Sequence, residues 1–322
     1  MPLAEKALIA RLRRETAEGS NVVTGIGDDA AVLRLPAGHE ALVTTDFTLE
    51  GIHFRRDSHP AKSVGHRCLT RGLSDIAGMG GEPLSLFLSL ALPRDLAQKW
   101  VDAFMMGLLN LARKFGVSLA GGDTAESPDG ILADIVVLGS APRGKAILRS
   151  GARPGDRLYV SGALGGSAAA ARRMLDQPKR RLKPANYAQH FFPEPRLALG
   201  RMLREKGLAS AMIDISDGLS TDLAHICEES GVGAELQAEA IPRATVGKPA
   251  REVELHFALH GGEDYELLFT APRGKRIPAR FAGVGITQIG HVTRGKRVFL
   301  MNEKGERYEF RPQGWEHFRS KS

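Results

Sequence analysis

Five short acidic motifs, each beside glycines or at the apparent end of a strand or helix, constrain this chain most strongly. They are Gly25–Asp29 (GIGDD), Thr44–Asp46 (TTD), Leu73–Asp75 (LSD), Gly121–Thr124 (GGDT) and Ile213–Gly218 (IDISDG). Clustered carboxylates repel one another and destabilise a fold unless cations neutralise them. Hydroxyl and carboxylate oxygens are the ligands of Mg²⁺, which is commonly shared with substrate phosphates. The sequence therefore predicts a site for several Mg²⁺ ions, with Asp46 near its centre.

The composition is that of a globular protein and favours two domains or one large one. The chain has 322 residues, of which 43% are hydrophobic and 25% charged, and its net charge is +7. A basic protein can bind anionic partners such as nucleotide phosphates or nucleic acid. The basic residues are dispersed, however, and the densest clusters, at 11–14 and 179–181, contain no interleaved aromatic residues. We therefore expect no nucleic acid partner.

Cysteine usage and the ends of the chain predict a cytoplasmic location. Cys68 and Cys227 are the two cysteines, and neither belongs to a C-x-x-C pair, which excludes a disulfide framework and suits a reducing compartment. The N-terminal residues mix charges every few positions and predict an amphipathic helix, not a signal sequence. The longest apolar stretch, near 84–92, is too short to span a bilayer, so we expect no membrane association.

Apolar periodicity predicts strands and helices that alternate in both halves of the chain. Helices are expected at 3–17, 62–79, 95–115, 167–175, 195–206 and 219–230, and strands at 30–35, 41–45, 84–92, 117–120, 131–140, 157–161, 210–215, 265–269, 286–289 and 298–300. The polar segment 176–194 contains three prolines and predicts a surface connection. Prolines and glycines cluster at 142–156, so we expect domains at 1–143 and 144–322, of the α/β or α+β class.

Two nucleotide-binding motifs are nearly matched but do not fit their structural context. Gly25-x-Gly27-x-x-Ala30 has the dinucleotide spacing, but two aspartates occupy its loop and a strand is expected to follow where that motif requires a helix. A P-loop spacing ends in Gly144-Lys145-Ala146, with alanine where a hydroxyl must reach the metal. Any use of ATP must therefore proceed without these motifs.

Some of the acidic motifs also have ordinary structural interpretations. Threonines favour strands whatever their function, and Asp46 could cap a strand end. Ser216 or Asp217 could cap the helix expected at 219–230, which is compatible with metal binding. Neither His256 nor His260, which share a helix face, belongs to a zinc motif. The prediction of a metal site therefore rests on the five motifs together and not on any one of them.

Taken in order, the motifs resemble those of a known enzyme family. The segments GIGDDAAV, TTDFTLEGIHF, GLSDIAGMGG, GGDT, LRSGARPGD, IDISDGL and GGEDYELLF extend from about residue 20 to 270, and GWEHF follows at 314–318. This set is similar to that of the thiamine-monophosphate kinases, in the superfamily of the aminoimidazole-ribonucleotide and selenophosphate synthetases. The resemblance implies transfer of phosphate from ATP to thiamine monophosphate, giving ADP and thiamine diphosphate.

The resemblance also implies an architecture and a set of site residues. The implied PurM-like fold has an N-terminal α+β domain that forms a barrel with its copy in a homodimer, and a C-terminal α/β domain, with the site between them. The implied Mg²⁺ ligands are Asp29, Thr44, Thr45, Asp46, Asp75, Asp123, Asp214 and Asp217. The implied nucleotide contacts are Gly122, Asp123, Arg149 and Ser216, and the implied substrate contacts are His53, Glu263 and Trp315. Phe104-Met105-Met106 stands where the family often has a tyrosine near ATP.

The expected chemistry is direct in-line phosphoryl transfer, assisted by Mg²⁺. The acceptor is an ionised phosphate oxygen, so we assign no general base. Three alternatives stay open at this point: another ATP-using synthetase of the same superfamily, a non-catalytic Mg²⁺–nucleotide sensor, and a metal-dependent phosphohydrolase. The products formed from ATP and thiamine monophosphate would distinguish them.

Overall fold

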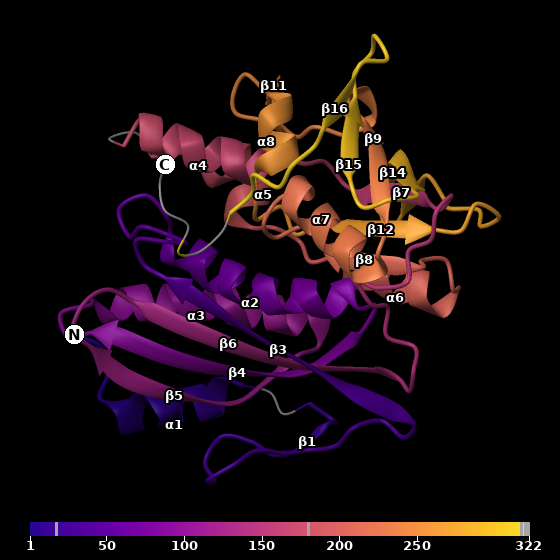
Figure 1. The fold of residues 1–322 in the computed structure, drawn as a ribbon. Helices are drawn as coiled ribbons and strands as arrows, with labels where there is room; N and C mark the ends of the chain where they lie inside the picture. Colours follow the sequence, from indigo (N-terminus) through magenta and orange to yellow (C-terminus); the bar gives the residue numbers. More distant parts are fainter. Residues whose placement is uncertain (17–18, 179–180, 316–317, 319–322) are drawn as a thin grey trace. The chain divides into compact units, whose positions relative to one another are not determined.

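The computed structural model describes residues 1–16, 19–178, 181–315 and 318, which divide into two compact units (Figure 1). The first unit contains Met1–Ile76 and Gly81–Lys145, and the second contains Ala77–Gly80 and Ala146–Ser322. In the described residues, no helix is both long enough and apolar enough to cross a membrane.

The first unit is a four-stranded sheet with two long helices on one face (Figure 1). Its elements are α1 (Glu5–Glu15), β1 (Val22–Thr24), β2 (Val32–Leu33), β3 (His39–Leu49), α2 (Ala61–Gly78, ending in the second unit), β4 (Glu82–Pro93), α3 (Gln98–Phe115), β5 (Ser118–Ser127) and β6 (Leu132–Pro142). The sheet order is β3-β6-β4-β5, in which only the β4–β5 pair is parallel. The short strands β1 and β2 form a separate antiparallel pair.

Glycines allow α2 and α3 to cross with their main chains in contact. A Cβ atom on Gly65 of α2 would overlap the carbonyl oxygen of Phe104 in α3, and a Cβ on Gly107 would overlap that of Lys62. Glycine inside a helix costs about 1 kcal/mol relative to alanine. Here the cost is offset by a helix–helix contact that no larger residue permits.

Strand alternation gives the two faces of this sheet different surroundings. Leu42 and Thr48 of β3 are buried, whereas Val43 and Phe47 are 67% and 55% exposed. Successive side chains of a strand point to opposite faces, so one face of β3 packs towards the helices and the other carries exposed apolar side chains.

Two strands of this unit are longer than the sequence predicted. The expected strand at 41–45 extends to Leu49, and the one at 117–120 extends to Ser127. Asp46 therefore lies within β3, not at its end, and GGDT lies within β5. The reason is pairing: β3 is matched to β6 along its whole length, and β5 to β4 from Ser118 to Ser127. These contacts outweigh the poor strand propensity of glycine and aspartate.

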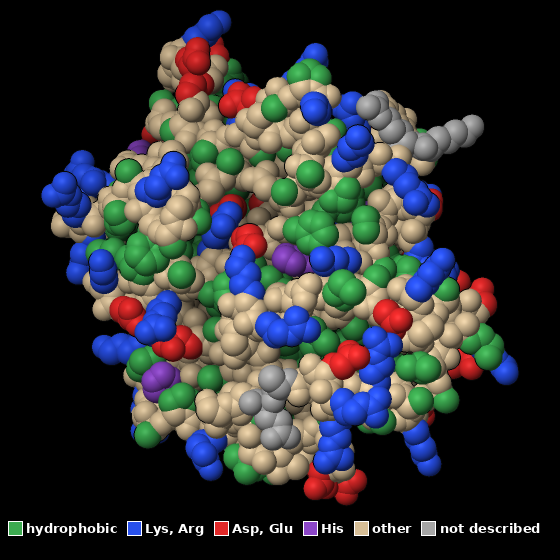
Figure 2. Space-filling view, turned by 180° about the vertical axis from the view of Figure 1, so that it is seen from behind, with side chains coloured by type: hydrophobic (Ala, Val, Ile, Leu, Met, Phe, Trp, Pro, Cys, Tyr) green, Lys and Arg blue, Asp and Glu red, His purple; other side chains and the backbone are tan. Residues whose placement is uncertain are grey.

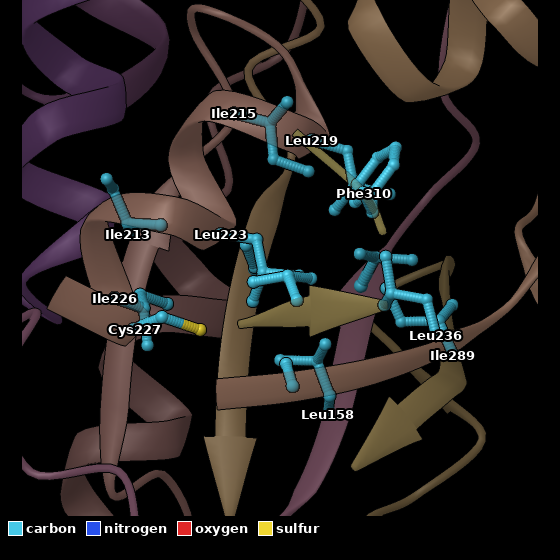
Figure 3. Close-up of a cluster of buried hydrophobic side chains, with 14 of the residues drawn as sticks. Leu158, Ile213, Ile215, Leu219, Leu223, Ile226, Cys227, Leu236, Ile289 and Phe310 are labelled. Carbon is cyan, nitrogen blue, oxygen red and sulfur yellow. The ribbon is translucent and has the colours of Figure 1, made fainter. Parts of the chain in front are cut away.

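The second unit is built on a larger, mostly antiparallel sheet in the order β16-β15-β9-β14-β7-β12-β8. Its strands are β7 (Arg157–Ser161), β8 (Ala211–Asp214), β9 (Gly233–Gln237), β10 (Thr245–Val246), β11 (Arg251–Glu252), β12 (Leu267–Ala271), β13 (Arg280–Phe281), β14 (Val284–Thr293), β15 (Val298–Met301) and β16 (Arg307–Glu309). Its helices are α4 (Gly166–Asp176), η1 (Pro184–Asn186), α5 (Ala188–Phe191), α6 (Leu197–Glu205), α7 (Leu219–Ser230), η2 (Ala238–Ala240) and α8 (Leu255–His260). Figure 3 shows its core, where Leu223 and Ile226 of α7 meet Leu158, Leu236 and Ile289 of the sheet.

The prediction of a surface connection at 176–194 was wrong for the part that the structure describes. η1 and α5 lie in this segment, and Leu182, Tyr187 and Phe191 are buried with Ala170 and Met174 of α4. The prolines suggested a loop, but the aromatic side chains bury enough apolar surface to hold the segment against α4.

Candidate functional site

Two of the acidic motifs line one cavity in the first unit. The cavity has a volume of about 330 Å³ and is lined by Asp28, Asp29, Gly122 and Asp123, over apolar side chains that include Phe87. The Oγ1 atom of Thr124, which also lines it, is buried and has no hydrogen-bond partner within the described residues. A cavity with an apolar wall, carboxylates and an unpaired hydroxyl has the features of a ligand site.

Gly122 allows the two strands at this cavity to approach each other. Its φ angle is 149°, and a Cβ atom would overlap the main chain of Leu88 on β4. Only glycine avoids this clash, so GGDT can lie in the strand beside β4 and present Asp123 at the cavity. The structure thus brings together Asp29, Gly122 and Asp123 from the predicted site.

A second group of predicted residues lies where β3 meets α2. Thr44 Oγ1 donates a hydrogen bond to Asp75 Oδ2, and Asp46 Oδ1 lies 3.6 Å from Arg71 Nε. Burial, and then the charge of Asp75, raise the pKa of Asp46 to about 7, although Arg71 opposes the rise. Two close carboxylates facing one arginine favour a further cation, and their oxygens are suitable ligands for Mg²⁺.

Thr45 does not share this arrangement. Its hydroxyl donates to Asp134 Oδ1 at 2.8 Å, on the opposite face of the sheet from Thr44 and Asp46 because side chains alternate along β3. If Thr45 and Asp46 hold one cation, Thr45 must bind it through a main-chain oxygen.

His53 lies in the turn after β3 and has a defined tautomer. Its Nδ1 atom accepts a hydrogen bond from the main-chain amide of Leu49 at 3.0 Å. An accepting Nδ1 carries no proton, so the neutral ring carries its proton on Nε2. His53 is therefore arranged to donate a hydrogen bond from Nε2.

In the second unit, main-chain hydrogen bonds join three segments that carry predicted site residues. The amide of Glu263 donates to the Ser216 carbonyl at 2.7 Å, that of Tyr265 donates to Ile215 at 2.9 Å, and that of Trp315 donates to Asp217 at 3.1 Å. Glu263 and Tyr265 have φ angles of 63° and 52°, which are unfavourable for residues other than glycine. Ser216, Asp217, Glu263 and Trp315 are thus brought together.

Sequence reasoning missed Asp222, which determines the conformation of this loop. The N-cap of α7 is Gly218, not Ser216 or Asp217 as we considered from the sequence. Asp222 Oδ2 accepts the amides of Asp217 and Gly218 at 3.2 and 3.0 Å. Burial, and then the charges of Asp214 and Asp217, raise the pKa of Asp222 well above its ordinary value. An acidic residue in the first turn of the helix was the available signal.

Asp214 and Asp222 are buried, at 4% and 1% exposure. One ligand atom from each of Asp217, Asp222 and His225 lies within 4.8 Å of the others.

Arg149 is exposed, and its carbonyl accepts a hydrogen bond from Ser230 Oγ at 3.1 Å. Phe104, by contrast, is buried against Trp100 with ring centroids 5.5 Å apart, so its ring packs in the core of the first unit.

Basic residues form no single patch on the face seen in Figure 2, where Lys and Arg side chains are scattered among acidic and apolar ones. This distribution agrees with the dispersed basic residues of the sequence. A nucleic acid surface normally gathers such residues along one stripe or patch.

Comparison with known proteins places these features in a family. Two family models match: the N-terminal domain of AIR synthase related proteins at residues 27–141, and the C-terminal domain at 153–302. The thiamine-monophosphate kinase of Salmonella typhimurium is 37% identical over 334 residues, covering 99% of both chains. The chain belongs to the thiamine-monophosphate kinase family. The relative from Escherichia coli K12 is 36% identical, again over 99% of both chains.

Solved structures agree with this family and its fold. The thiamine-monophosphate kinase of Stenotrophomonas maltophilia K279a superimposes with a TM-score of 0.81 at 36% identity, over 95% of this chain and 98% of that one. AaThiL complexed with AMPPCP and TMP gives a TM-score of 0.76 at 30% identity, over 97% and 96% of the chains. Escherichia coli HypE, a hydrogenase maturation protein, gives 0.76 at 20% identity and shares the fold. The two-domain fold that the resemblance implied for a single chain is confirmed.

The environment of His260, at the end of α8, predicts a pH dependence of stability. Burial, and then the charge of His256, lower its pKa from 6.5 to about 4. Below pH 6.5 the unfolded chain therefore binds a proton that the folded chain excludes, so the free energy of unfolding falls as the pH drops from 6.5 to about 4. Urea unfolding at several pH values should show a shallower fall for His260→Gln. His291 is exposed, so His291→Gln is the control. If the free energy of unfolding fell equally steeply with pH in the wild type and both variants, His260 would not be the source of the pH dependence.

Proposed function

We propose that this protein transfers the γ-phosphoryl group of ATP to thiamine monophosphate, forming thiamine diphosphate and ADP. The observation that carries the proposal is near-full-length identity of 36–37% to thiamine-monophosphate kinases. The superposition on AaThiL complexed with AMPPCP and TMP supports it. In the reaction, an oxygen of the acceptor phosphate attacks the γ-phosphorus as the bond to ADP breaks. The acceptor oxygen is already ionised, so no protein base is needed.

We propose that Mg²⁺ binds the acidic residues, because the donor set fits it. All the donors are oxygens, as Mg²⁺ requires. Burial, and then the charge of Asp75, raise the pKa of Asp46, and a bound cation would favour its ionised form. The proposed ligands are Asp29, Thr44, Thr45, Asp46, Asp75 and Asp123 in the first unit, and Asp214 and Asp217 in the second. When bound, Mg²⁺ would neutralise the phosphate charges that oppose the reaction.

The remaining predicted residues are proposed to bind and orient the two substrates. The cavity beside Gly122 and Asp123 would hold the nucleotide, with the unpaired Thr124 hydroxyl as an available polar contact. Arg149 and Ser216 are proposed as further nucleotide contacts. Holding the reacting groups in line accounts for much of phosphoryl-transfer catalysis.

On the acceptor side, we propose roles for His53, Glu263 and Trp315. The Nε2–H group of His53 can donate a hydrogen bond to phosphate. Thiamine carries a positive thiazolium ring, which a Glu263 carboxylate attracts. The indole of Trp315, which is 54% exposed, can stack on a cationic or aromatic ring.

We also propose a cytoplasmic homodimer with domains at 1–143 and 144–322. The exposed apolar side chains Val43 and Phe47 on β3 support a partner sheet on that face, because such patches usually mark interfaces. The buried free thiols of Cys68 and Cys227 are compatible with a reducing compartment.

The direct test is to incubate the purified protein with ATP, Mg²⁺ and thiamine monophosphate and to separate the products. We expect equal amounts of thiamine diphosphate and ADP, and no product when EDTA replaces Mg²⁺. Release of inorganic phosphate without thiamine diphosphate would identify a phosphohydrolase instead. Binding of ATP without any product would favour a nucleotide sensor.

A further inference from the structure

The C-terminal segment of the second unit crosses the N-terminal end of α7. After β16, Phe310 is buried and its amide donates to the Val298 carbonyl at 2.8 Å. Its ring centroid lies 5.5 Å from that of His260, and it belongs to the same hydrophobic core as Leu219, the first residue of α7 (Figure 3). Phe310 therefore anchors the segment in the core just before it reaches Trp315.

Three consecutive amides of this segment are hydrogen-bonded to residues in the first turn of α7 or in the loop just before it. Gln313 N donates to Ser220 Oγ at 3.2 Å, Gly314 N donates to Thr221 Oγ1 at 3.1 Å, and Trp315 N donates to the Asp217 carbonyl at 3.1 Å. We call this set of three hydrogen bonds the tail clasp. Two of its three acceptors are side-chain hydroxyls.

The contact surrounding the tail clasp is close and specific. A Cβ atom on Gly314 would overlap the Asp217 carbonyl oxygen and would lie 2.5 Å from Thr221 Oγ1, so only glycine fits there. Ser220 Oγ also lies 2.9 Å from His260 Nδ1. If the Ser220 hydroxyl donates this hydrogen bond to His260 Nδ1, the lone pairs of Ser220 Oγ stay available to accept from the amide of Gln313.

The side chain that follows this fixed main chain is exposed. Trp315 is 54% exposed although its own amide is held by Asp217. Fixing a side chain's main chain before a ligand arrives reduces the entropy lost on binding. An exposed indole on a fixed main chain is therefore suited to contact a ligand, whereas a tail that only covers the core would bury its aromatic side chain.

We propose that Ser220 and Thr221 are positioning residues for the acceptor, acting through Trp315. Their hydroxyls hold Gln313 and Gly314 so that the indole of Trp315 meets the ring system of thiamine monophosphate. The Asp217 carbonyl ties the same segment to the loop proposed to bind metal and nucleotide. This inference rests on the proposed function, and it assigns to α7 a role in binding the acceptor.

The test is the double variant Ser220→Ala/Thr221→Val, assayed for thiamine diphosphate formation. We expect the KM for thiamine monophosphate to rise about tenfold, the effect of losing hydrogen bonds of modest net strength. The KM for ATP and the kcat should change less than twofold. Thr221→Ser keeps the hydroxyl and is the matched control, with an expected KM near that of the wild type.

A second measurement separates positioning from a general loss of structure. In a Trp315→Ala background, the Ser220→Ala/Thr221→Val change should raise the KM for thiamine monophosphate less than twofold further, because residues that act through one another are not additive. An unchanged KM in the first test, or additive effects in the second, would overturn the positioning role. A wild-type protein that forms no thiamine diphosphate would instead overturn the proposed function.

Discussion

Replacing Asp46 by asparagine is expected to lower kcat by roughly two to three orders of magnitude, the size of effect seen when one key electrostatic group of an active site is removed. The same change should leave the metal-free protein as stable as the wild type, or more stable. The asparagine amide is a poorer Mg²⁺ ligand than a carboxylate. It also carries no charge to oppose that of Asp75, which lies on the neighbouring helix α2.

The stability gain should depend on pH in a defined direction. The folded pKa of Asp46 is about 7 and its ordinary value is 3.8, so ionised Asp46 destabilises the metal-free fold progressively as the pH rises from 3.8 to 7. Thermal unfolding in EDTA should therefore show the largest gain for Asp46→Asn above pH 7. Asp129 is an exposed carboxylate in the turn before β6. Asp129→Asn is therefore the control and should change neither kcat nor the stability of the metal-free protein. Near-normal turnover by Asp46→Asn would contradict the central position of this residue.

Gly107→Ala should destabilise the first unit by about 3 kcal/mol, the upper part of the usual range for overpacking a core. The added methyl group would overlap the Lys62 carbonyl, and the neighbouring contact of Gly65 with Phe104 leaves the helices no room to shift. A small protein has a total stability of only about 5–15 kcal/mol, so a loss of this size should be evident as reduced yield or early unfolding. Urea unfolding measures it.

Met106→Ala provides the matched control for this prediction. Met106 precedes Gly107 on α3 but is 52% exposed, so its truncation should change the free energy of unfolding by no more than about 0.5 kcal/mol. Equal stabilities for the two variants would show that α2 and α3 can separate without penalty.

The candidate site residues and most helices could be predicted from the sequence, because short motifs and apolar periodicity are local patterns. The lengths of β3 and β5 could not. Gly121 and Gly122 lie beyond the strand expected at 117–120, yet they belong to β5, since pairing with β4 supplies hydrogen bonds that propensity ignores. The opposite orientation of Thr45 follows from the two-residue period of a strand, once Asp46 is known to lie within that strand.

Other parts of the site depend on contacts that no local pattern reveals. The amides of Gln313 and Gly314 meet α7 from more than ninety residues further along the chain. Asp222 looked like an ordinary acidic residue in a first helical turn, and its role became apparent only with the conformation of residues 217–218. Contacts between residues so far apart in the sequence can be identified only in the folded structure.

Main-chain hydrogen bonds join the segments that carry Ser216, Asp217, Glu263 and Trp315. This has a consequence for attempts to change the proposed acceptor substrate. These hydrogen bonds run through amide and carbonyl groups, which every amino acid except proline can supply in full. The main-chain hydrogen bonds themselves therefore do not depend on which side chain stands at 263 or 315. Glycine and asparagine at 263 would even relieve its φ of 63°. If Glu263 and Trp315 contact the acceptor as proposed, substitutions there would alter acceptor preference while keeping these main-chain hydrogen bonds.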